Sequence, residues 1–289
     1  MQPGRAVLVT LAVLSLAGRV EAQWLNYPTP GIPRLPDGKP NLAAPPPQTA
    51  DGRPDLSGLW ATPCPPEDRG PDCPANPERL FFDLAKDLEP SDVEMTPWAA
   101  AIQKQRESRD HVDDPYGYCL PPGVPRIHFV GGNYRILSTP GITAFLHETA
   151  VGLMFRQVFT DGRPLPTVTE PTWLGYSVGR WDGDTFVVDT TGFRDLGWLD
   201  TLKGRPHSDA LHVTERFRRR DFGHIDLAIT INDPKAFVKP WVVRTVLTLK
   251  PDTELLESFC DNHDKTMEHR RIAPPPPEPP SGAIPDAVR

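Results

Sequence analysis

The sequence predicts a mainly β protein, in which an antiparallel meander closes into a barrel and carries a small helical insertion. The first observation is a series of short β-rich runs after residue 127, separated by turn signals such as Pro140-Gly141 and Asp161-Gly162. The second is the segment Trp181-Asp-Gly-Asp-Thr185, where an Asp-Gly turn joins two such runs as a hairpin. An open sheet of this size leaves unpaired edges, which closure into a barrel removes. A β-sandwich is the alternative architecture.

The N-terminal residues 1–22 have the layout of a secretory signal peptide. One basic residue lies in Met1–Arg5, a short apolar run covers Ala6–Gly18, and Val20-Glu21-Ala22 provides a cleavage pattern. The apolar run is too short to remain as a spanning helix, although a retained anchor is the alternative interpretation. We therefore expect an exported protein, periplasmic or extracellular, without stable membrane insertion.

The rest of the chain divides by composition. Residues 23–55 are rich in Pro, Asp and Gly and are expected to form an extended arm, and 271–289 form a Pro-rich tail. Between them, 56–270 form the barrel domain, which begins with a strand in 55–60. An insertion at 61–125 contains a Cys/Pro loop and the only convincing helix.

The helix is expected to begin after Thr96, because a cap residue followed by Pro97 is typical of a helix N-terminus and Ala99–Arg109 are good helix formers. The expected strands then follow in order. They are 134–139, 142–148, 153–160, 173–181, 185–192, 211–220, 224–232, 241–249 and 254–261.

The four cysteines suit a disulfide framework in an exported chain. Three pairings are possible, and we favour Cys64 with Cys73 in the local loop and Cys119 with Cys260 over a long range. A zinc site is disfavoured because no C-x2-C pair exists. The net charge of −7 and the single basic strip, Arg216–Arg220, argue against nucleic-acid binding, which needs a broad basic field. Such a strip is usually a solvated face.

Alternation along the strands indicates which side chains face the interior. Glu215 shares a strand face with Val213 and Phe217, and Glu257 shares one with Leu255 and Phe259. A buried carboxylate is costly unless it is paired or protonated. The two glutamates therefore predict a polar spot inside an apolar lumen.

The segment 205–217 holds the densest group of titratable side chains, with His207 and Asp209 in a loop and His212 and Glu215 on the following strand. Two imidazoles and two carboxylates resemble a metal-ligand set. However, His212 and Glu215 are separated by an odd number of positions and point to opposite faces of a strand, so no metal site is predicted. In the simplest alternative, Glu215 pairs with an inward Arg or His and His212 caps a turn.

General acid–base catalysis is the chemical hypothesis that these residues allow. A carboxylate in an apolar barrel has a raised pKa, and Glu215, Glu257 and His207 are the candidate catalytic residues. Ser208 lies beside His207 and Asp209 but lacks the nucleophile-elbow context. No glycine-rich phosphate loop follows a strand, so no cofactor is expected.

A lining for a small ligand is also expected. The candidate ligand-binding side chains are polar or aromatic residues on the strands and adjoining loops. They are Asp189, Asp209, His212, Trp181, Trp241 and Arg244. The loop at 190–200, which leads into the His207 segment, is the candidate lid over the pocket.

The motifs GRWDGDT at 179–185, HSDALHVTERF at 207–217 and NDPKAF at 232–237 resemble those of an exported family of unknown function from acidobacteria and proteobacteria. This resemblance implies no activity. A looser resemblance, through the Gly-x-Trp of Ser57-Gly-Leu-Trp60, is to calycin or lipocalin-like barrels. The long insertion at 61–125, and a Pro-rich tail in place of a final helix, depart from that pattern.

Together these observations favour an exported barrel that binds a small, largely apolar molecule in its lumen. Two alternatives remain. One is a cofactor-independent enzyme of hydrolase, isomerase or lyase type that uses the inward carboxylates and a histidine. The other is a structural or interaction module with a filled core. A filled lumen would indicate the structural or interaction module, and a hollow lumen would indicate a binding protein or an enzyme.

Overall fold

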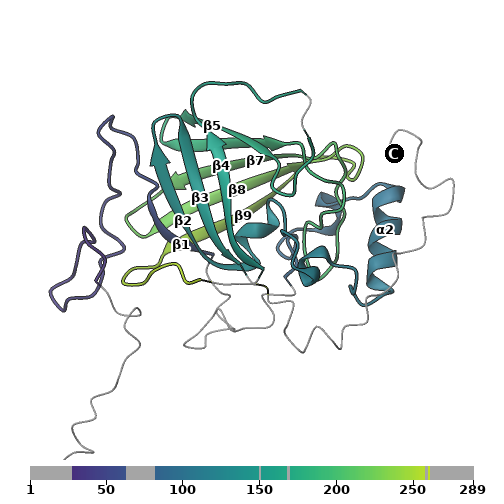
Figure 1. The fold of residues 1–289 in the computed structure, drawn as a ribbon, viewed down its shortest axis with the longest axis horizontal. Helices are drawn as coiled ribbons and strands as arrows, with labels where there is room; N and C mark the ends of the chain where they lie inside the picture. Colours follow the sequence, from purple (N-terminus) through teal and green to yellow (C-terminus); the bar gives the residue numbers. More distant parts are fainter. Residues whose placement is uncertain (1–27, 63–81, 150, 168–169, 258–259, 261–289) are drawn as a thin grey trace, which may run out of the picture.

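The computed structural model describes residues 28–62, 82–149, 151–167, 170–257 and 260. In these residues, nine strands form one closed barrel (Figure 1). The strands are β1 (Gly58–Ala61), β2 (Gly131–Thr139), β3 (Ile142–Thr149), β4 (Gly152–Phe159), β5 (Tyr176–Asp182), β6 (Thr185–Thr191), β7 (His212–Arg219), β8 (His224–Asn232) and β9 (Trp241–Leu249). The predicted signal peptide, the pair Cys64–Cys73 and the Pro-rich tail lie outside the described residues.

Eight of the strands after residue 127 lie close to the predicted ranges, but the predicted strand 254–261 does not form in the described residues. After β9, Asp252 adopts a left-handed backbone with φ 60°. There it is held by Arg34 at 2.5 Å, and its backbone N–H donates to Thr29 at 2.8 Å. The barrel is closed instead by β1, in which Trp60 pairs with Leu249 of β9.

One step of the barrel departs from the antiparallel meander. β4 and β5 run parallel and share only two residue pairs, Val158 with Ser177 and Phe159 with Val178. Parallel neighbours need a crossover of about a dozen residues or more, and the connection between 159 and 176 is long enough to provide it. The junction between β1 and β9 also consists of two pairs. We call these two places the seams of the barrel.

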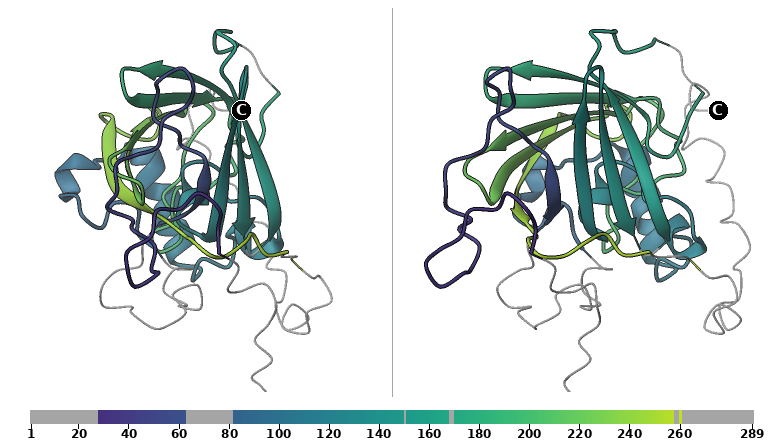
Figure 2. Two further views of the ribbon diagram at one scale, coloured as in Figure 1. Left: turned by 90° about the vertical axis from the view of Figure 1, so that its left-hand side faces the viewer. Right: turned by 60° about the vertical axis from the view of Figure 1, so that its left-hand side comes forward.

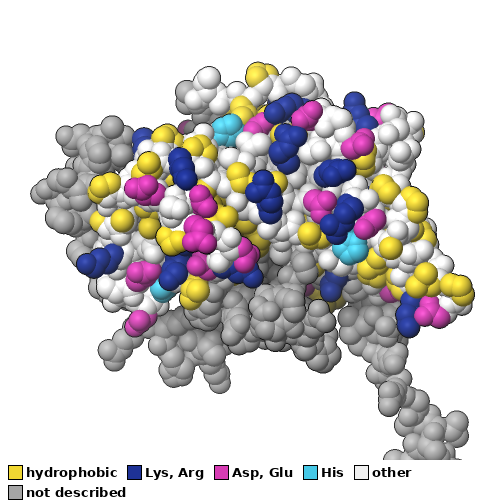
Figure 3. Space-filling model, turned by 180° about the vertical axis from the view of Figure 1, so that it is seen from behind, with side chains coloured by type: hydrophobic (Ala, Val, Ile, Leu, Met, Phe, Trp, Pro, Cys, Tyr) yellow, Lys and Arg dark blue, Asp and Glu magenta, His cyan; other side chains and the backbone are white. Residues whose placement is uncertain are grey.

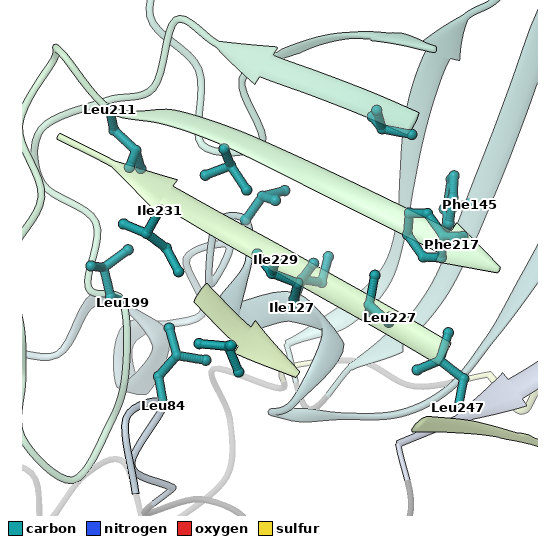
Figure 4. Close-up of a cluster of buried hydrophobic side chains, with 14 of the residues drawn as sticks. Leu84, Ile127, Phe145, Leu199, Leu211, Phe217, Leu227, Ile229, Ile231 and Leu247 are labelled. Carbon is teal, nitrogen blue, oxygen red and sulfur yellow. The ribbon is translucent and has the colours of Figure 1, made fainter. Parts of the chain in front are cut away.

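The barrel interior is formed by alternate residues of each strand. On β8, Ile225, Leu227, Ile229 and Ile231 are all buried, as their period-two spacing predicts. Figure 4 shows two of the labelled β8 residues beside Ile127, which comes from the insertion rather than from a strand. The apolar core therefore includes a segment that precedes β2.

The insertion between β1 and β2 contains the helix α2 (Pro97–Glu107) and the 3-10 turns η4 (Pro90–Asp92), η5 (Pro115–Tyr118) and η6 (Arg126–His128). α2 starts as predicted, since the Thr96 hydroxyl accepts a hydrogen bond from the backbone N–H of Ala99 at 3.3 Å. It lies beside the barrel (Figures 1 and 2). All three residues of η6 are buried, so this turn carries His128 into the barrel.

The N-terminal arm covers the end of the barrel at which the β7–β8 turn lies. The backbone N–H groups of Phe222 and Gly223, in the β7–β8 turn, donate to the carbonyls of Ala44 and Leu42. Arg219 stacks on the ring of Trp60 with its guanidinium 4.9 Å from the ring centroid. The arm therefore packs on this end of the barrel as an ordered segment, and Figure 2 shows it running along that end.

The predicted long-range disulfide is confirmed, since Cys119 of the insertion and Cys260 beyond β9 are bonded with their Cα atoms 5.6 Å apart. It fastens the segment after β9 to the insertion. No helix in the described part of the chain is long and apolar enough to cross a membrane.

Candidate functional site

A polar cluster lies inside the barrel around Glu215. This residue sits on β7 between Val213 and Phe217, and its side chain is fully buried, as the alternation predicts. Arg156 of β4 donates to both carboxylate oxygens, from Nη1 at 3.1 Å and from Nη2 at 2.5 Å. His128 of η6 contacts the same carboxylate through Nε2 at 2.6 Å. The simplest alternative gives Glu215 an inward Arg or His as its partner, and the structure provides both, as Arg156 and His128.

The guanidinium of Arg156 also bridges the seam between β4 and β5. Its Nε donates to the hydroxyl of Ser177 on β5 at 3.1 Å, and its Nη2 donates to the hydroxyl of Thr190 on β6 at 2.7 Å. All three side chains are buried. One arginine thus connects the central carboxylate to the strands on the far side of the seam.

These partners decide the charge of Glu215. Burial by itself raises the pKa of this carboxyl, but the charge of Arg156 and the hydrogen bond from His128 outweigh it and bring the pKa down to about 2. The expectation of a carboxylate with a raised pKa is therefore wrong for Glu215. It is ionised at neutral pH, accepts hydrogen bonds from its neighbours and has no proton to donate.

Three polar atoms in this region have no hydrogen-bond partner among the described residues: Nδ1 of His128, Nε2 of His147 and the hydroxyl of Tyr134. All three side chains are buried. Their rings are neighbours, with the centroids of Tyr134 and His147 4.7 Å apart and that of His128 5.3 and 5.5 Å from them. We call Glu215, Arg156, His128, His147 and Tyr134 the inner polar cluster.

Burial sets the protonation states of His147 and Tyr134. It lowers the pKa of His147 well below the ordinary value, and the nearby His128 and Arg156 lower it further. It raises the pKa of Tyr134 well above the ordinary value, and the charge of Glu215 adds to this effect. His147 is therefore a neutral imidazole and Tyr134 a neutral phenol at physiological pH.

The pairing with Glu215 also fixes the tautomer of His128. An ionised carboxylate only accepts hydrogen bonds, so Nε2 of His128 carries a proton. In the neutral ring, Nδ1 then holds a lone pair and can accept a hydrogen bond or a proton. The carboxylate is placed to stabilise the imidazolium that forms. A buried imidazole oriented by a carboxylate is the arrangement used for general base catalysis.

His207, the predicted partner of Glu215, lies elsewhere. It is buried in the loop before β7, where Nδ1 faces the carbonyl of Ser208 at 3.1 Å and the ring meets Phe193 edge-on. A Cβ atom at Gly197 would lie only 2.2 Å from Nε2 of His207, so this loop closes tightly on the ring. Burial lowers the pKa of His207. No hydrogen bond or ion pair joins it to Glu215 in the described ranges.

The loop at 190–200, expected to be a lid, instead buries much of its length. Phe193, Trp198, Leu199 and Asp200 are all buried, while Leu196 is exposed. Next to it, the hydroxyl of Ser208 donates to Asp233 at 2.7 Å, so this serine belongs to a structural turn.

The prediction that Glu257 faces the interior of the barrel is wrong. This residue is exposed in the irregular segment after β9 and does not enter the barrel, because the strand that would have carried it does not form. Asp209 is also exposed, and it pairs with Lys235 at 2.7 Å. Neither side chain contributes to the inner polar cluster.

The remaining predicted ligand-binding residues are divided between the outer wall and the barrel ends. Asp189 and His212 pair at 3.1 Å on the outer side of β6 and β7, where the hydrogen bond from His212 lowers the pKa of Asp189. His212 thus faces away from Glu215, as strand parity predicts, but it does not cap a turn. Trp181 contacts Phe186, and Trp241 is buried against Phe237. Arg244 is exposed on β9.

His207, Asp209, His212 and Glu215 do not form one site, since only Glu215 lies inside the barrel. Across the part of the chain that the structure describes, no group of three or more His, Cys, Asp or Glu side chains is placed to hold a metal ion.

The sequence interpretation missed His128 and Arg156. A signal existed for Arg156 and His147, because each occupies an inward position on its strand, beside Val158 and Phe145 respectively. No such signal existed for His128, which reaches the barrel through a turn of the insertion. Comparisons with protein-family models, with curated proteins and with solved structures find no match to this chain.

Proposed function

We propose that this is an exported barrel protein that binds a small molecule at the inner polar cluster. The molecule has a largely apolar body and one hydrogen-bonding group. The observation that carries the proposal is the set of three unpaired polar atoms on His128, His147 and Tyr134, buried side by side. A buried polar group without a partner costs about 1–3 kcal/mol, so three neighbouring ones are costly unless something binds them.

The surroundings of these atoms support the apolar body. Phe145 contacts the rings of Tyr134 and His147, with centroids 6.3 and 6.2 Å away, and Phe217 lies 5.6 Å from Phe145. An aromatic lining with a few convergent polar groups is typical of small-molecule sites. A neutral imidazole and a neutral phenol suit an uncharged hydroxyl, because a second charge beside the ion pair of Arg156 and Glu215 would be poorly solvated.

Export is the part of the proposal that rests on the disulfide and the N-terminal sequence. The bond between Cys119 and Cys260 suits an oxidising compartment, where such bonds persist. The signal-peptide pattern of residues 1–22 points the same way. Mass spectrometry of the protein recovered from its host will test export directly, through loss of these residues from the mature N-terminus.

Tyr134→Phe is the sharpest test of the binding site, because it removes one unpaired hydroxyl and keeps the ring. The matched control is Tyr116→Phe, whose buried hydroxyl donates to the carbonyl of Val130 at 2.8 Å. Phenol is the binding probe and benzene is the apolar comparison, both measured by isothermal titration calorimetry. We expect phenol to bind more tightly than benzene, and Tyr134→Phe to weaken phenol binding about five- to tenfold.

The control variant separates binding from folding. Tyr116→Phe should leave phenol affinity unchanged and cost about 1 kcal/mol of unfolding free energy, since it removes a satisfied hydrogen bond. Tyr134→Phe should leave the unliganded protein equally stable or more stable. If phenol and benzene bind equally, or neither binds, the proposed site is wrong and the filled structural core is the better description.

A second candidate function, catalysis without a cofactor, is favoured by one observation. His128 carries its proton on the nitrogen that faces Glu215 and presents Nδ1 unpaired within the cluster. In hydrolysis, Nδ1 would take a proton from a water molecule as that water attacks an ester carbonyl. The tetrahedral intermediate would then break its bond to the alcohol oxygen, and the alcohol would leave with the proton from Nδ1. Turnover of p-nitrophenyl acetate that is lost in His128→Gln, but kept in His207→Gln, would support this function. Equal turnover by both variants would exclude it for this substrate.

A further inference from the structure

A row of arginines crosses the outer wall of the barrel. Cross-strand register sets Ala228 of β8 opposite Arg216 on β7 and opposite Arg244 on β9. Neighbouring strands lie about 4.8 Å apart, so the two arginine backbones are about 10 Å apart with a small residue between them. Both arginine side chains are exposed. This register places the small side chain of Ala228 between the two arginine positions, and all three residues line one groove.

This groove has a volume of about 420 Å³ and lies on the outside of β6 to β9. Its lining combines arginine side chains with small or apolar ones. The lining residues are Thr185, Arg216, Arg218, Asp226, Leu227, Ala228, Arg244, Thr245 and Val246. Figure 3, which views the molecule from behind, shows basic side chains gathered in the middle of the visible face, with acidic ones among them.

The charge of the groove is positive although the chain carries a net charge of −7. Its lining holds three arginines and a single acidic residue, Asp226, which already pairs with Arg220 outside the lining at 2.9 Å. Arg216 pairs with Asp182 at 2.8 Å. Neither Arg218 nor Arg244 has an ion pair or a side-chain hydrogen bond with any other described residue. Two guanidinium groups are therefore available to an incoming anion.

We propose that this groove binds an organic anion, whose carboxylate, sulfate or phosphate group is bound by Arg218 and Arg244 and whose body rests on Ala228 and Val246. Guanidinium groups match the geometry of such oxyanions and bind them through paired, charge-assisted hydrogen bonds. The inorganic ion alone would leave the apolar floor uncovered. The site is on the outer wall, so it is independent of the function proposed for the barrel interior.

Three probes separate the parts of this proposal: 2-naphthalenesulfonate, the neutral 2-naphthol and inorganic sulfate. Binding is followed by shifts of the backbone amide resonances of Ala228 and Val246 in ¹⁵N NMR spectra at low ionic strength. We expect the sulfonate to bind at least tenfold more tightly than the naphthol or the sulfate ion. Added salt should weaken it, because the groove is open to solvent.

Arg244→Gln removes one of the two unpaired guanidinium groups, and Arg163→Gln is the control. Arg163 is an exposed arginine in the β4–β5 connection, away from the groove lining, and its loss changes the net charge equally. We expect Arg244→Gln to weaken sulfonate binding about tenfold and Arg163→Gln to leave it within twofold. Asp226→Asn, which removes the only acidic lining residue, should tighten it.

Three results would overturn the proposal. Equal weakening by Arg244→Gln and Arg163→Gln would mean that only the overall charge is sensed. Equal binding of the naphthol and the sulfonate would mean that the arginines are not used. Equal binding of the sulfate ion would mean that the floor of the groove makes no contribution.

Discussion

Arg156 of β4 holds the carboxylate of Glu215 on β7 by two hydrogen bonds, across the interior of the barrel and with no exposure of the carboxylate. The pair combines a full positive and a full negative charge in the buried interior, where only uncharged hydroxyl groups and the His128 imidazole bond to it. Its effect on stability and on pH dependence gives the first two predictions.

Removing one partner of this pair should be more damaging than removing both. Arg156→Met leaves the Glu215 charge buried with only His128 beside it, and we expect it to lower the unfolding free energy by about 3–5 kcal/mol. The double variant Arg156→Met/Glu215→Leu should recover much of that loss, because no uncompensated charge remains. Urea denaturation of the wild type, both single variants and the double variant measures the coupling. Additive effects of the two substitutions would contradict it.

Acid should weaken the fold through Glu215. Its pKa falls from 4.5 to about 2 on folding, so its contribution is complete above pH 4.5 and disappears as the pH falls toward 2. The shift corresponds to a contribution on the order of 3 kcal/mol. We expect the unfolding free energy of the wild type to drop steeply in this window, and that of Glu215→Gln to drop less. Parallel curves would show that Glu215 does not carry the effect.

The buried histidines should cause a second, shallower loss of stability as the pH falls, and this loss begins at a higher pH than the one caused by Glu215. Burial lowers the pKa of both His147 and His207, so the unfolded chain takes up protons first as the pH falls below about 6.5. Stability from these groups is therefore present above pH 6.5 and lost below it. His147→Phe should flatten the unfolding free energy between pH 6.5 and 4.5. An unchanged slope in this variant would assign the loss to other groups.

Hydrogen exchange should reveal the open edge of β4. The β3–β4 ladder ends on the pair Thr149 with Gly152, and hydrogen-bonded pairs alternate from there along the two strands. The N–H groups of Met154 and Arg156 therefore bond to β3, and those of Leu153 and Phe155 point away from it. β5 pairs only with Val158 and Phe159. We expect fast exchange at Leu153 and Phe155 and slow exchange at Met154 and Arg156, measured by NMR. Equal protection at all four would require a partner for this edge.

Much of the barrel was predictable because its strands obey a strict two-residue period between clear turn signals. The alternation of Ile225, Leu227, Ile229 and Ile231 identifies the inner face of β8, and the same parity places Glu215 inside and His212 outside. These are local properties of the chain. For the same reason the helix start at Thr96 was predictable from a cap and a proline.

The rest depends on contacts between distant segments. The partners of Glu215 lie 59 and 87 positions away on Arg156 and His128, and nothing near His128 indicates that its turn enters a barrel. The run after Pro251 has strand-like alternation, yet β1 already occupies the place beside β9, so Glu257 stays outside. Alternation fixes the face of a strand but does not determine whether the strand finds a neighbour.

The two seams are the places where the barrel wall has the fewest residue pairs between strands. They divide the wall into two half-shells, β1 to β4 on one side and β5 to β9 on the other, and neighbouring strands within each half-shell share at least three residue pairs. Each seam consists of two pairs. Separation of the half-shells at the β4–β5 seam would break two residue pairs and leave the ladders within each half-shell intact. Because Arg156 of β4 bonds to Ser177, Thr190 and Glu215 across that seam, the same separation would also break the ion pair at the barrel centre.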